Sequence, residues 1–370
     1  MTKAMNNHVE YMQRAIRLAK KGLYTTDPNP CVGCVIVKDG EIVGEGWHQR
    51  AGEGHAEVNA LNQAGSKAQG ATVYVTLEPC SHTGKTPPCA DALIGAGVKK
   101  VFAAMKDPNP LVSGNGLKKL NDAHIETDSG LLESQARALN PGFVKRMESG
   151  RPYVRVKLAM SLDGRTAMAS GESKWISSDA SRNDVQHLRA QSSAILTGID
   201  TVLADDPSMN VRLNVDELNI ESAVRVVRQP KRIVLDSQFR MPAEANIFSK
   251  DGECIVYTTV NVDNKDSYPY TIETIGLLDG HINLHGLMKD LADKEINLIH
   301  VEAGSVLCGA LLKNDLVDEI IIYMAPHIMG DSAKGLFNLP GLEEMKDRVS
   351  LNIKDVRAIG SDIRITAFVE

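Results

Sequence analysis

The most constraining feature of this sequence is an ordered set of four residues whose side chains can bind metal or move protons. This set, the frame, comprises His55, Glu57, Cys80 and Cys89. One imidazole and two thiolates suit a tetrahedral zinc ion whose fourth position stays open for water. Glu57 stands two residues from the histidine, where it is placed to move protons rather than to bind the metal. We therefore expect His55, Cys80 and Cys89 to hold one zinc ion and Glu57 to be catalytic.

Two other interpretations of this frame stay open. The histidine and the cysteines can be ordinary core residues, because free cysteine behaves as a small buried hydrophobe. Alternatively the zinc is structural, which requires a fourth protein ligand, and the nearby candidates are Cys31, Cys34 and His82. Cys31 and Cys34 form a CxxC, which alone could indicate redox chemistry or a second metal. Cys34 opens a β-branched run, however, and this favours packing.

The length and the charge of the chain narrow the class of protein. A chain of 370 residues predicts two domains. The formal net charge of -6 argues against broad nucleic-acid affinity, which needs a basic face, but it permits a small phosphorylated substrate. The six cysteines are scattered, and no apolar stretch is long enough to span a bilayer. We expect a cytoplasmic enzyme that binds neither nucleic acid nor membrane.

Strand and helix patterns alternate in the first half of the chain, and the candidate ligands fall at their junctions. The predicted strands are 31–37, 41–47, 71–77 and 100–105, and the predicted helices are 9–19, 55–64, 90–96 and 131–139. This alternation favours a three-layer α/β/α domain. A cluster of turn-forming residues at 140–152 then predicts a boundary, so we expect one domain at 1–147 and another at 148–370.

The second half of the chain also alternates, with one gap. The predicted strands are 153–158, 194–197, 231–236, 253–258 and 296–301, and the predicted helices begin near 178, 199 and 306. The region 260–286 is weakly patterned and stays unassigned. Between the last strand and its helix lies a turn of small residues, where backbone N–H groups can hold a phosphate. Such residues form a plain tight turn equally often.

Residues 1–147 resemble the deaminase half of the bifunctional riboflavin-biosynthesis deaminase–reductases. The matching motifs are Pro28-Asn29-Pro30 with Val32-Gly33, His55-Ala56-Glu57, and the loop at 79–89. Cytidine and tRNA-adenosine deaminases are less similar, because their two cysteines usually stand two residues apart, whereas eight residues separate Cys80 from Cys89. The resemblance implies a cytidine-deaminase-like domain. It also implies substrate contacts at Asn29, His48 and Lys85, which are otherwise solvated loop residues.

The remainder of the chain resembles the reductase domain of the same family, which has a dihydrofolate-reductase-like α/β fold and uses NADPH. The matching motifs are Ser161-Leu162-Asp163-Gly164-Arg165, Trp175-Ile176, Ala204-Asp205-Asp206-Pro207 and Val301-Glu302 with Gly304. The family commonly has glycine where this chain has Ala303, a difference that bears on how closely the pyrophosphate approaches the backbone.

The resemblance assigns cofactor and substrate contacts residue by residue. The implied NADPH contacts are Ala159, Trp175, Thr201, Asp205, Ser237, Gly304, Ser305, Val306, Leu307, Cys308, Gly309 and Ala310. The implied substrate contacts are Ser173, Arg189, Met209, Arg212 and Glu302. The two arginines offer planar forks suited to a sugar phosphate. The alternatives are core packing for Trp175 and a helix-ending turn for Asp205.

These observations favour a bifunctional enzyme of riboflavin synthesis. Its first half would deaminate a diaminopyrimidinone ribosyl phosphate with zinc, and its second half would reduce the resulting aminouracil ribosyl phosphate with NADPH. One rival is a nucleic-acid base deaminase with an appended domain, which the acidic charge and the long loop between the cysteines disfavour. The other is the zinc-stabilised binding protein described above. We expect a homo-oligomer, although the sequence does not give its subunit number.

Overall fold

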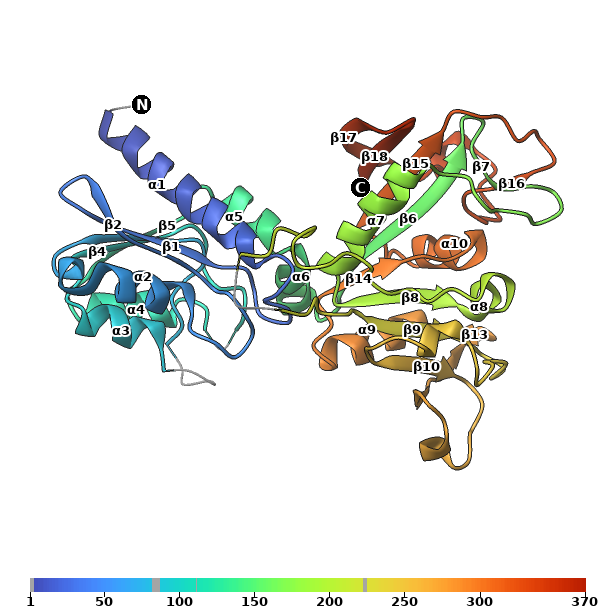
Figure 1. Ribbon diagram of the computed structural model, residues 1–370, viewed down its shortest axis with the longest axis horizontal. Coiled ribbons are helices and arrows are strands. Elements are labelled where there is room, and N and C mark those ends of the chain that lie inside the picture. The colour runs from blue at the N-terminus through green and yellow to red at the C-terminus, as the bar shows by residue number, and fades with distance from the viewer. Residues whose placement is uncertain (1–2, 82–86, 111, 222–224) are drawn as a thin grey trace. The chain divides into compact units, whose positions relative to one another are not determined.

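The structure, a computed structural model, describes residues 3–81, 87–110, 112–221 and 225–370 (Figure 1). Contacts divide the chain into two compact units. Unit 1 comprises Met1–Gly150 and Asn214–Val227, and unit 2 comprises Arg151–Leu213 and Arg228–Glu370. The segment Asn214–Val227 therefore packs with the first unit although its neighbours in sequence belong to the second. Within the described ranges, no helix has both the length and the apolar character needed to cross a membrane.

Unit 1 is built on a five-stranded sheet with the order β2-β1-β3-β4-β5. β1 runs antiparallel to both of its neighbours, and β3, β4 and β5 are parallel. The strands are β1 (Gly33–Lys38), β2 (Glu41–Trp47), β3 (Thr72–Val75), β4 (Lys100–Ala103) and β5 (Glu126–Ser129). The helices are α1 (Lys3–Ala19), α2 (Ala56–Ala64), α3 (Cys89–Gly95), α4 (Asn115–Asp122), α5 (Glu133–Leu139) and α6 (Pro141–Ser149).

Helices cover both faces of this sheet, because its central strands carry buried apolar residues on both faces (Figure 1). One face packs on α2, α3 and α4, and the other packs on α1, α5 and α6. The predicted three-layer α/β/α domain is confirmed. A close approach fixes α2, because a Cβ on Gly46 of β2 would lie 2.4 Å from the carbonyl oxygen of Ala56. This contact sets the first turn of α2 directly against the sheet.

Unit 2 contains a nine-stranded sheet with the order β11-β10-β9-β8-β14-β6-β15-β18-β17. Every pair from β11 to β15 is parallel, and β15-β18 and β18-β17 are antiparallel. In chain order the strands are β6 (Tyr153–Ser161), β8 (Ala194–Gly198), β9 (Lys231–Leu235), β10 (Cys254–Thr258), β11 (Thr271–Thr274), β14 (Leu298–Val301), β15 (Glu319–Ala325), β17 (Leu351–Ile359) and β18 (Asp362–Val369).

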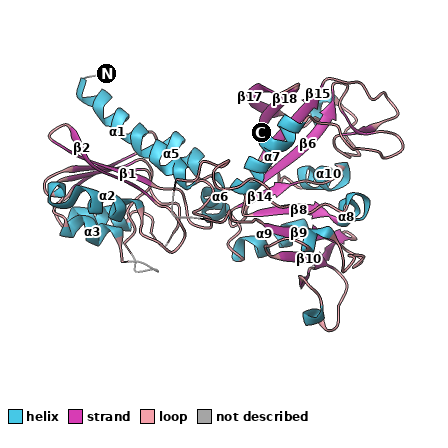
Figure 2. Ribbon diagram, in the orientation of Figure 1, coloured by secondary structure: helices cyan, strands magenta, loops and turns pink. Residues whose placement is uncertain are grey.

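Helices cover this larger sheet on both faces (Figure 2). They are α7 (Asp179–Gln191), α8 (Ile199–Asp205), α9 (Leu284–Asp293) and α10 (Ser305–Lys313). α9 and α10 share one apolar core with the sheet, and α7 and α8 lie over residues of the opposite face. Two small sheets pair β7 (Arg165–Ala167) with β16 (Lys334–Gly335) and β12 (Leu277–Leu278) with β13 (His281–Ile282). Short 3-10 turns are η1 (Lys20–Gly22), η2 (Gly65–Ala68), η3 (Asn246–Phe248), η4 (Lys265–Ser267) and η5 (Met345–Asp347).

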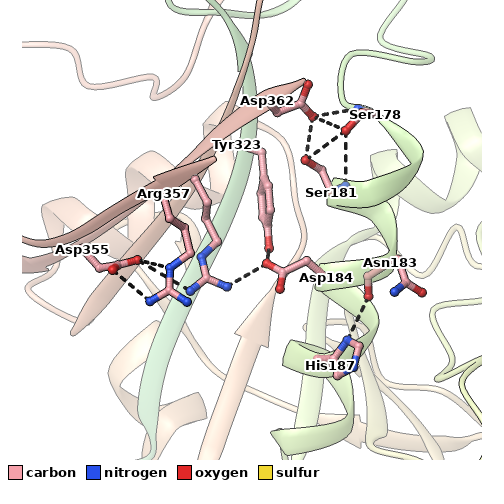
Figure 3. A network of polar contacts seen from close by, with 10 residues as sticks. Ser178, Ser181, Asn183, Asp184, His187, Tyr323, Asp355, Arg357 and Asp362 are labelled. Atoms are coloured by element: carbon pink, nitrogen blue, oxygen red, sulfur yellow. Dashed lines mark hydrogen bonds and ion pairs between the residues drawn. The ribbon is translucent and has the colours of Figure 1, made fainter. Parts of the chain in front are cut away.

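A polar network fastens α7 to the C-terminal hairpin of β17 and β18 (Figure 3). Ser178 caps the helix, because its Oγ accepts a hydrogen bond from the N–H of Ser181 at 3.3 Å. The buried carboxylate of Asp362 accepts from the N–H and the Oγ of Ser178, both at 2.8 Å, and from Ser181 Oγ at 2.6 Å. Further along the helix, Asp184 pairs with Arg364 at 2.7 Å. The hairpin therefore sets the position of α7.

Candidate metal centre and second functional site

The candidate zinc ligands stand at the starts of two helices and after the end of a strand. His55 precedes α2, Cys80 follows β3, and Cys89 begins α3. His55 Nδ1 lies 3.0 Å from Cys89 Sγ and 3.6 Å from Cys80 Sγ, and all three ligand atoms lie within 4.8 Å of one another. Tetrahedral ligands at zinc bond lengths of about 2.0–2.3 Å stand roughly 3.5–3.8 Å apart. The nitrogen and the two sulfurs thus fit one zinc ion.

The other interpretations of this frame find less support. Within the part of the chain that the structure describes, the group of potential ligands contains three residues and no fourth. Cys31 Sγ contacts Thr26 Oγ1 at 3.3 Å, and Cys34 is fully buried in β1, where it packs in the core. His82 lies outside the described residues.

Burial and neighbouring groups tune the acid–base chemistry of this site. Glu57 lies in the first turn of α2 and is 3% exposed, and burial raises its pKa to about 7. A carboxyl group that titrates near neutrality can both accept and release a proton. Hydrogen bonds from Cys89 and His55 lower the pKa of the Cys80 thiol, which favours the thiolate that a metal binds.

The structure brings two of the three predicted substrate contacts of this unit to the metal centre. Asn29 Nδ2 lies 3.1 Å from His48 Nε2, and the His48 ring stands edge-on to the His55 ring with their centres 5.3 Å apart. Lys85, the third, lies outside the described residues. Sequence reasoning missed Asn140, whose side chain bonds both the N–H and the carbonyl of Cys31 at 2.7 and 2.9 Å. Nothing in the sequence signals so distant a partner.

The predicted contacts of unit 2 gather beyond the carboxyl ends of four adjacent parallel strands, β9, β8, β14 and β6. In an open parallel sheet this edge is where ligands bind. Ala159 lies near the end of β6, Thr201 on α8 after β8, Ser237 after β9, and Glu302 after β14. Residues far apart in the sequence thus share one edge of the sheet.

Arg189 of α7 and Glu302 form a nearly buried, two-pronged ion pair. Arg189 Nε lies 2.5 Å from Glu302 Oε1, and its Nη2 lies 3.0 Å from Oε2. Nη1 donates to the carbonyl of Asn210 at 3.0 Å. Burial alone would raise the pKa of Glu302, but Arg189 holds it well below its usual range. Arg189 therefore orients Glu302, and the exposed Arg212 is the better placed of the two arginines to meet a phosphate.

Lys157 of β6 belongs to the same charged cluster, although sequence reasoning did not select it. Burial lowers its pKa, the negative charge of Glu302 raises it, and the positive charge of Arg189 lowers it further. Its ammonium group lies 5.8 Å from the centre of the Tyr323 ring. The signal was present in the sequence, since Arg155 and Lys157 interrupt an otherwise largely apolar strand.

Trp175 and its neighbours form an exposed loop before α7. Trp175 is 75% exposed, so the alternative that it packs in the core is wrong, and the guanidinium of Arg182 lies 4.7 Å from its ring centre. Lys174 Nζ lies 3.5 Å from Asp205, which links this loop to the end of α8. Ser173 is exposed on the same loop. By contrast, Met209 is buried in the apolar cluster beside α8.

The start of α10 separates the run 304–310 into two groups. Gly304 precedes the helix, and Ser305, Val306 and Leu307 form its first turn, where N–H groups are free of intrahelical bonds. Cys308 and Gly309 are buried, and a Cβ on Gly309 would lie 2.1 Å from the carbonyl oxygen of Asn338. Ala310 follows in the next turn. The first turn is thus the part that suits a phosphate, and Gly309 serves packing.

Comparisons with known proteins match both units. The family model for the cytidine and deoxycytidylate deaminase zinc-binding region matches residues 5–105, and the model for the RibD C-terminal domain matches residues 152–365. The chain is 54% identical to "Riboflavin biosynthesis protein RibD" of Escherichia coli (strain K12), over 95% of this chain and 97% of the relative. It is 52% identical to the Haemophilus influenzae protein of the same name, over 96% of both chains.

Solved structures are similar over nearly the whole chain. Acinetobacter baumannii RibD is 46% identical with a TM-score of 0.90, and the comparison covers 99% of both chains. A diaminohydroxyphosphoribosylaminopyrimidine deaminase/5-amino-6-(5-phosphoribosylamino)uracil reductase from Thermotoga maritima is 33% identical with a TM-score of 0.85. The comparison covers 100% of the Thermotoga maritima chain and 99% of this chain.

Proposed function

The chain belongs to the RibD family of riboflavin biosynthesis proteins, and from that premise we propose how its residues divide a deamination and a reduction between them. The protein is a bifunctional enzyme with a zinc-binding deaminase domain and a reductase domain. We assign deamination of the diaminopyrimidinone ribosyl phosphate to residues 1–147. We assign reduction of the aminouracil ribosyl phosphate to residues 148–370, with NADPH as the hydride donor.

In the deaminase, His55, Cys80 and Cys89 would hold one zinc ion, and the bound ion would lower the pKa of a water molecule to about 7. Glu57 takes the proton of the attacking water on its carboxylate and delivers it to the departing amino group. The raised pKa of Glu57, a consequence of its burial, suits both steps. Asn29, His48 and Lys85 bind the substrate, and the first two already lie beside the metal ligands.

In the reductase, the residues beyond the carboxyl ends of the strands bind and orient the cofactor and the substrate. The contacts with NADPH come from Trp175 on the loop before α7, Asp205 at the end of α8, and Ala159, Thr201 and Ser237. The first turn of α10 receives the pyrophosphate of NADPH. Arg212 and Ser173 contact the substrate, whereas the buried Met209 supports the site from the apolar cluster beside α8. Arg189 keeps Glu302 ionised and oriented toward the substrate. Lys157 adds a positive charge to the same cluster.

The grouping of one histidine nitrogen, two cysteine sulfurs and a buried carboxylate carries this proposal. The test incubates purified protein with the diaminopyrimidinone phosphate, with and without NADPH, and identifies the products by mass. We expect the aminouracil phosphate without NADPH and the ribityl compound with it. Treatment with a chelator should abolish the first product and spare reduction of added aminouracil phosphate. Failure to deaminate would refute the assignment of unit 1.

We also propose that the enzyme works in the cytoplasm as a homo-oligomer. All six cysteines are free thiols, which suits a reducing compartment. The edge strand β17 exposes Ile353 and Val356, at 60% and 59%, and native proteins usually cover such an apolar edge. Sedimentation of the purified protein tests this. A monomer at all concentrations would contradict the oligomer.

A further inference from the structure

Glu78, two residues before the zinc ligand Cys80, is a buried carboxylate for which the proposed chemistry has no use. It is 3% exposed, and its two oxygens accept four backbone hydrogen bonds from the loop before α4 and from the start of that helix. A carboxylate has about four acceptor sites, so this set fills them. The donors are the N–H groups of Asp107 (3.1 Å), Gly114 (2.9 Å), Gly116 (2.9 Å) and Leu117 (3.2 Å).

Close packing at the next residue reinforces this arrangement. A Cβ on Gly116 would lie 1.9 Å from the carbonyl oxygen of Pro79 and 3.2 Å from Glu78 Oε1. The start of α4 therefore presses against the backbone on the amino-terminal side of Cys80. The negative charge of Glu78 also lies at the positive end of that helix, which stabilises the contact.

The other side of Cys80 is held by α3. The carbonyl of Cys80 accepts a hydrogen bond from the N–H of Ala90 at 3.1 Å, and its Sγ accepts one from the N–H of Cys89 at 3.3 Å. An ion pair between Asp91 and Lys119, at 2.7 Å, joins α3 to α4. Cys80 thus lies between two helix starts that are themselves connected.

We propose that Glu78 is a positioning residue for the metal centre: by binding four N–H groups of the 107–117 segment, it holds Cys80 in its metal-binding position before zinc arrives. The inference rests on the proposed function, because it takes Cys80 as a zinc ligand. A ligand fixed in advance loses less freedom when the metal binds. Partners that orient metal ligands are typically worth about 10- to 100-fold in metal affinity.

The test compares zinc affinity with folding in the full-length protein. The variant Glu78→Gln keeps the size of the side chain but replaces one acceptor oxygen with an amino group that faces N–H donors. We expect zinc affinity, measured by competition with a chelator, to fall about 10- to 100-fold. The matched control is Asp122→Asn, which removes an exposed ion pair of the same helix and should leave zinc affinity unchanged.

A role in stability alone would give a different result. In that case Glu78→Gln would lower the melting temperature of the metal-free protein and leave its zinc affinity at the parent value, and the inference would be overturned. Hydrogen exchange of the parent gives a second test that needs no variant. The amides of Gly114, Gly116 and Leu117 should stay protected after zinc is removed, and loss of that protection would also overturn the inference.

These outcomes are distinguishable from failure of the proposed function. If the parent binds no zinc, or if Cys80→Ser retains it, the metal site itself is wrong and the role of Glu78 falls with it. If the parent binds zinc through Cys80 and Glu78→Gln binds it equally well, the proposed function stands and the positioning role is refuted.

Discussion

At the scale of single residues, the chemistry of unit 1 depends on which atoms meet around the metal. Serine is nearly the size of cysteine, but its hydroxyl is a poor zinc ligand at neutral pH. We expect Cys80→Ser and Cys89→Ser each to lose most of the bound zinc, measured by metal analysis after dialysis. Cys31→Ser is the matched control, since Cys31 contacts Thr26 rather than the ligand group, and it should keep its zinc. Full occupancy in both ligand variants would refute the ligand set.

Glu57 gives a second prediction, in which metal binding and turnover separate. Glutamine has almost the same shape as glutamate but cannot accept a proton from the attacking water. Glu57→Gln should therefore retain zinc and lose deamination by at least about a hundredfold, the usual contribution of a positioned acid–base group. Initial rates with the diaminopyrimidinone phosphate measure this, and reduction by unit 2 in the same preparation is the control. Near-normal deamination with zinc retained would mean that another group moves the protons.

At the scale of elements, α7 depends on the carboxylate of Asp362. Asp362→Asn weakens three hydrogen bonds at the start of the helix, so we expect the free energy of unfolding of unit 2 to fall by about 1–3 kcal/mol. Urea unfolding measures it. The control is Asp200→Asn, because Asp200 and its ion-pair partner Arg240 are exposed and lie outside this network, so their pair should matter little. Equal stability of the Asp362 variant and the parent would show that the hairpin does not hold α7.

The same contact predicts how stability depends on pH. Burial raises the pKa of Asp362, but the hydrogen bonds from Ser181 and Ser178 outweigh it, and the folded-state pKa lies below the usual 3.8. A group with a lowered folded-state pKa contributes stability above its unfolded pKa and loses it as the pH falls through the folded value. The difference in stability between parent and Asp362→Asn should therefore be full near neutrality and shrink in acid below about pH 3.8. A difference that stays constant from neutrality down to pH 2 would contradict this.

The positions of helices and strands with a clear local sequence pattern were predictable. The positions of those stabilised by partners distant in sequence were not. The β-branched apolar runs of β1, β3 and β4 and the capped start of α7 predicted the positions of these elements within a few residues. The helix α4 is absent from the sequence-based prediction, because its start is stabilised by the carboxylate of Glu78, which is remote in sequence. The hairpin β17–β18 was missed, since its exposed edge carries apolar and charged residues without a buried face. The pairing of Arg189 with Glu302 was equally hidden, as it forms only when α7 crosses β14.

At the scale of the whole molecule, the segment Asn214–Val227 limits how the chain can be divided. A fragment of residues 151–370 should bind NADPH and reduce the aminouracil phosphate without zinc, because unit 2 holds every proposed contact. Leu218 and Ile220 of the segment are buried in the full chain, where the segment packs with unit 1. In the fragment they would be exposed and cause self-association.

The measurement for this fragment combines activity with light scattering. We expect the fragment to form large, heterogeneous particles, and the variant with Leu218→Ser and Ile220→Ser to remain smaller with the same rate of NADPH oxidation. If the unsubstituted fragment forms particles as small as those of the variant, exposure of Leu218 and Ile220 does not cause self-association. A folded fragment without NADPH oxidation would show that the cofactor site borrows residues of unit 1.

The discontinuous make-up of unit 1 also affects the order of events on the ribosome. Domains generally fold as they emerge, beginning from the N-terminus. Here the first unit cannot make all its contacts at Gly150, because Asn214–Val227 has not yet been synthesised. By the time Val227 leaves the exit tunnel, β6, α7, β8 and α8 have already emerged. The nascent chain can therefore complete its first unit only after the second has begun to form.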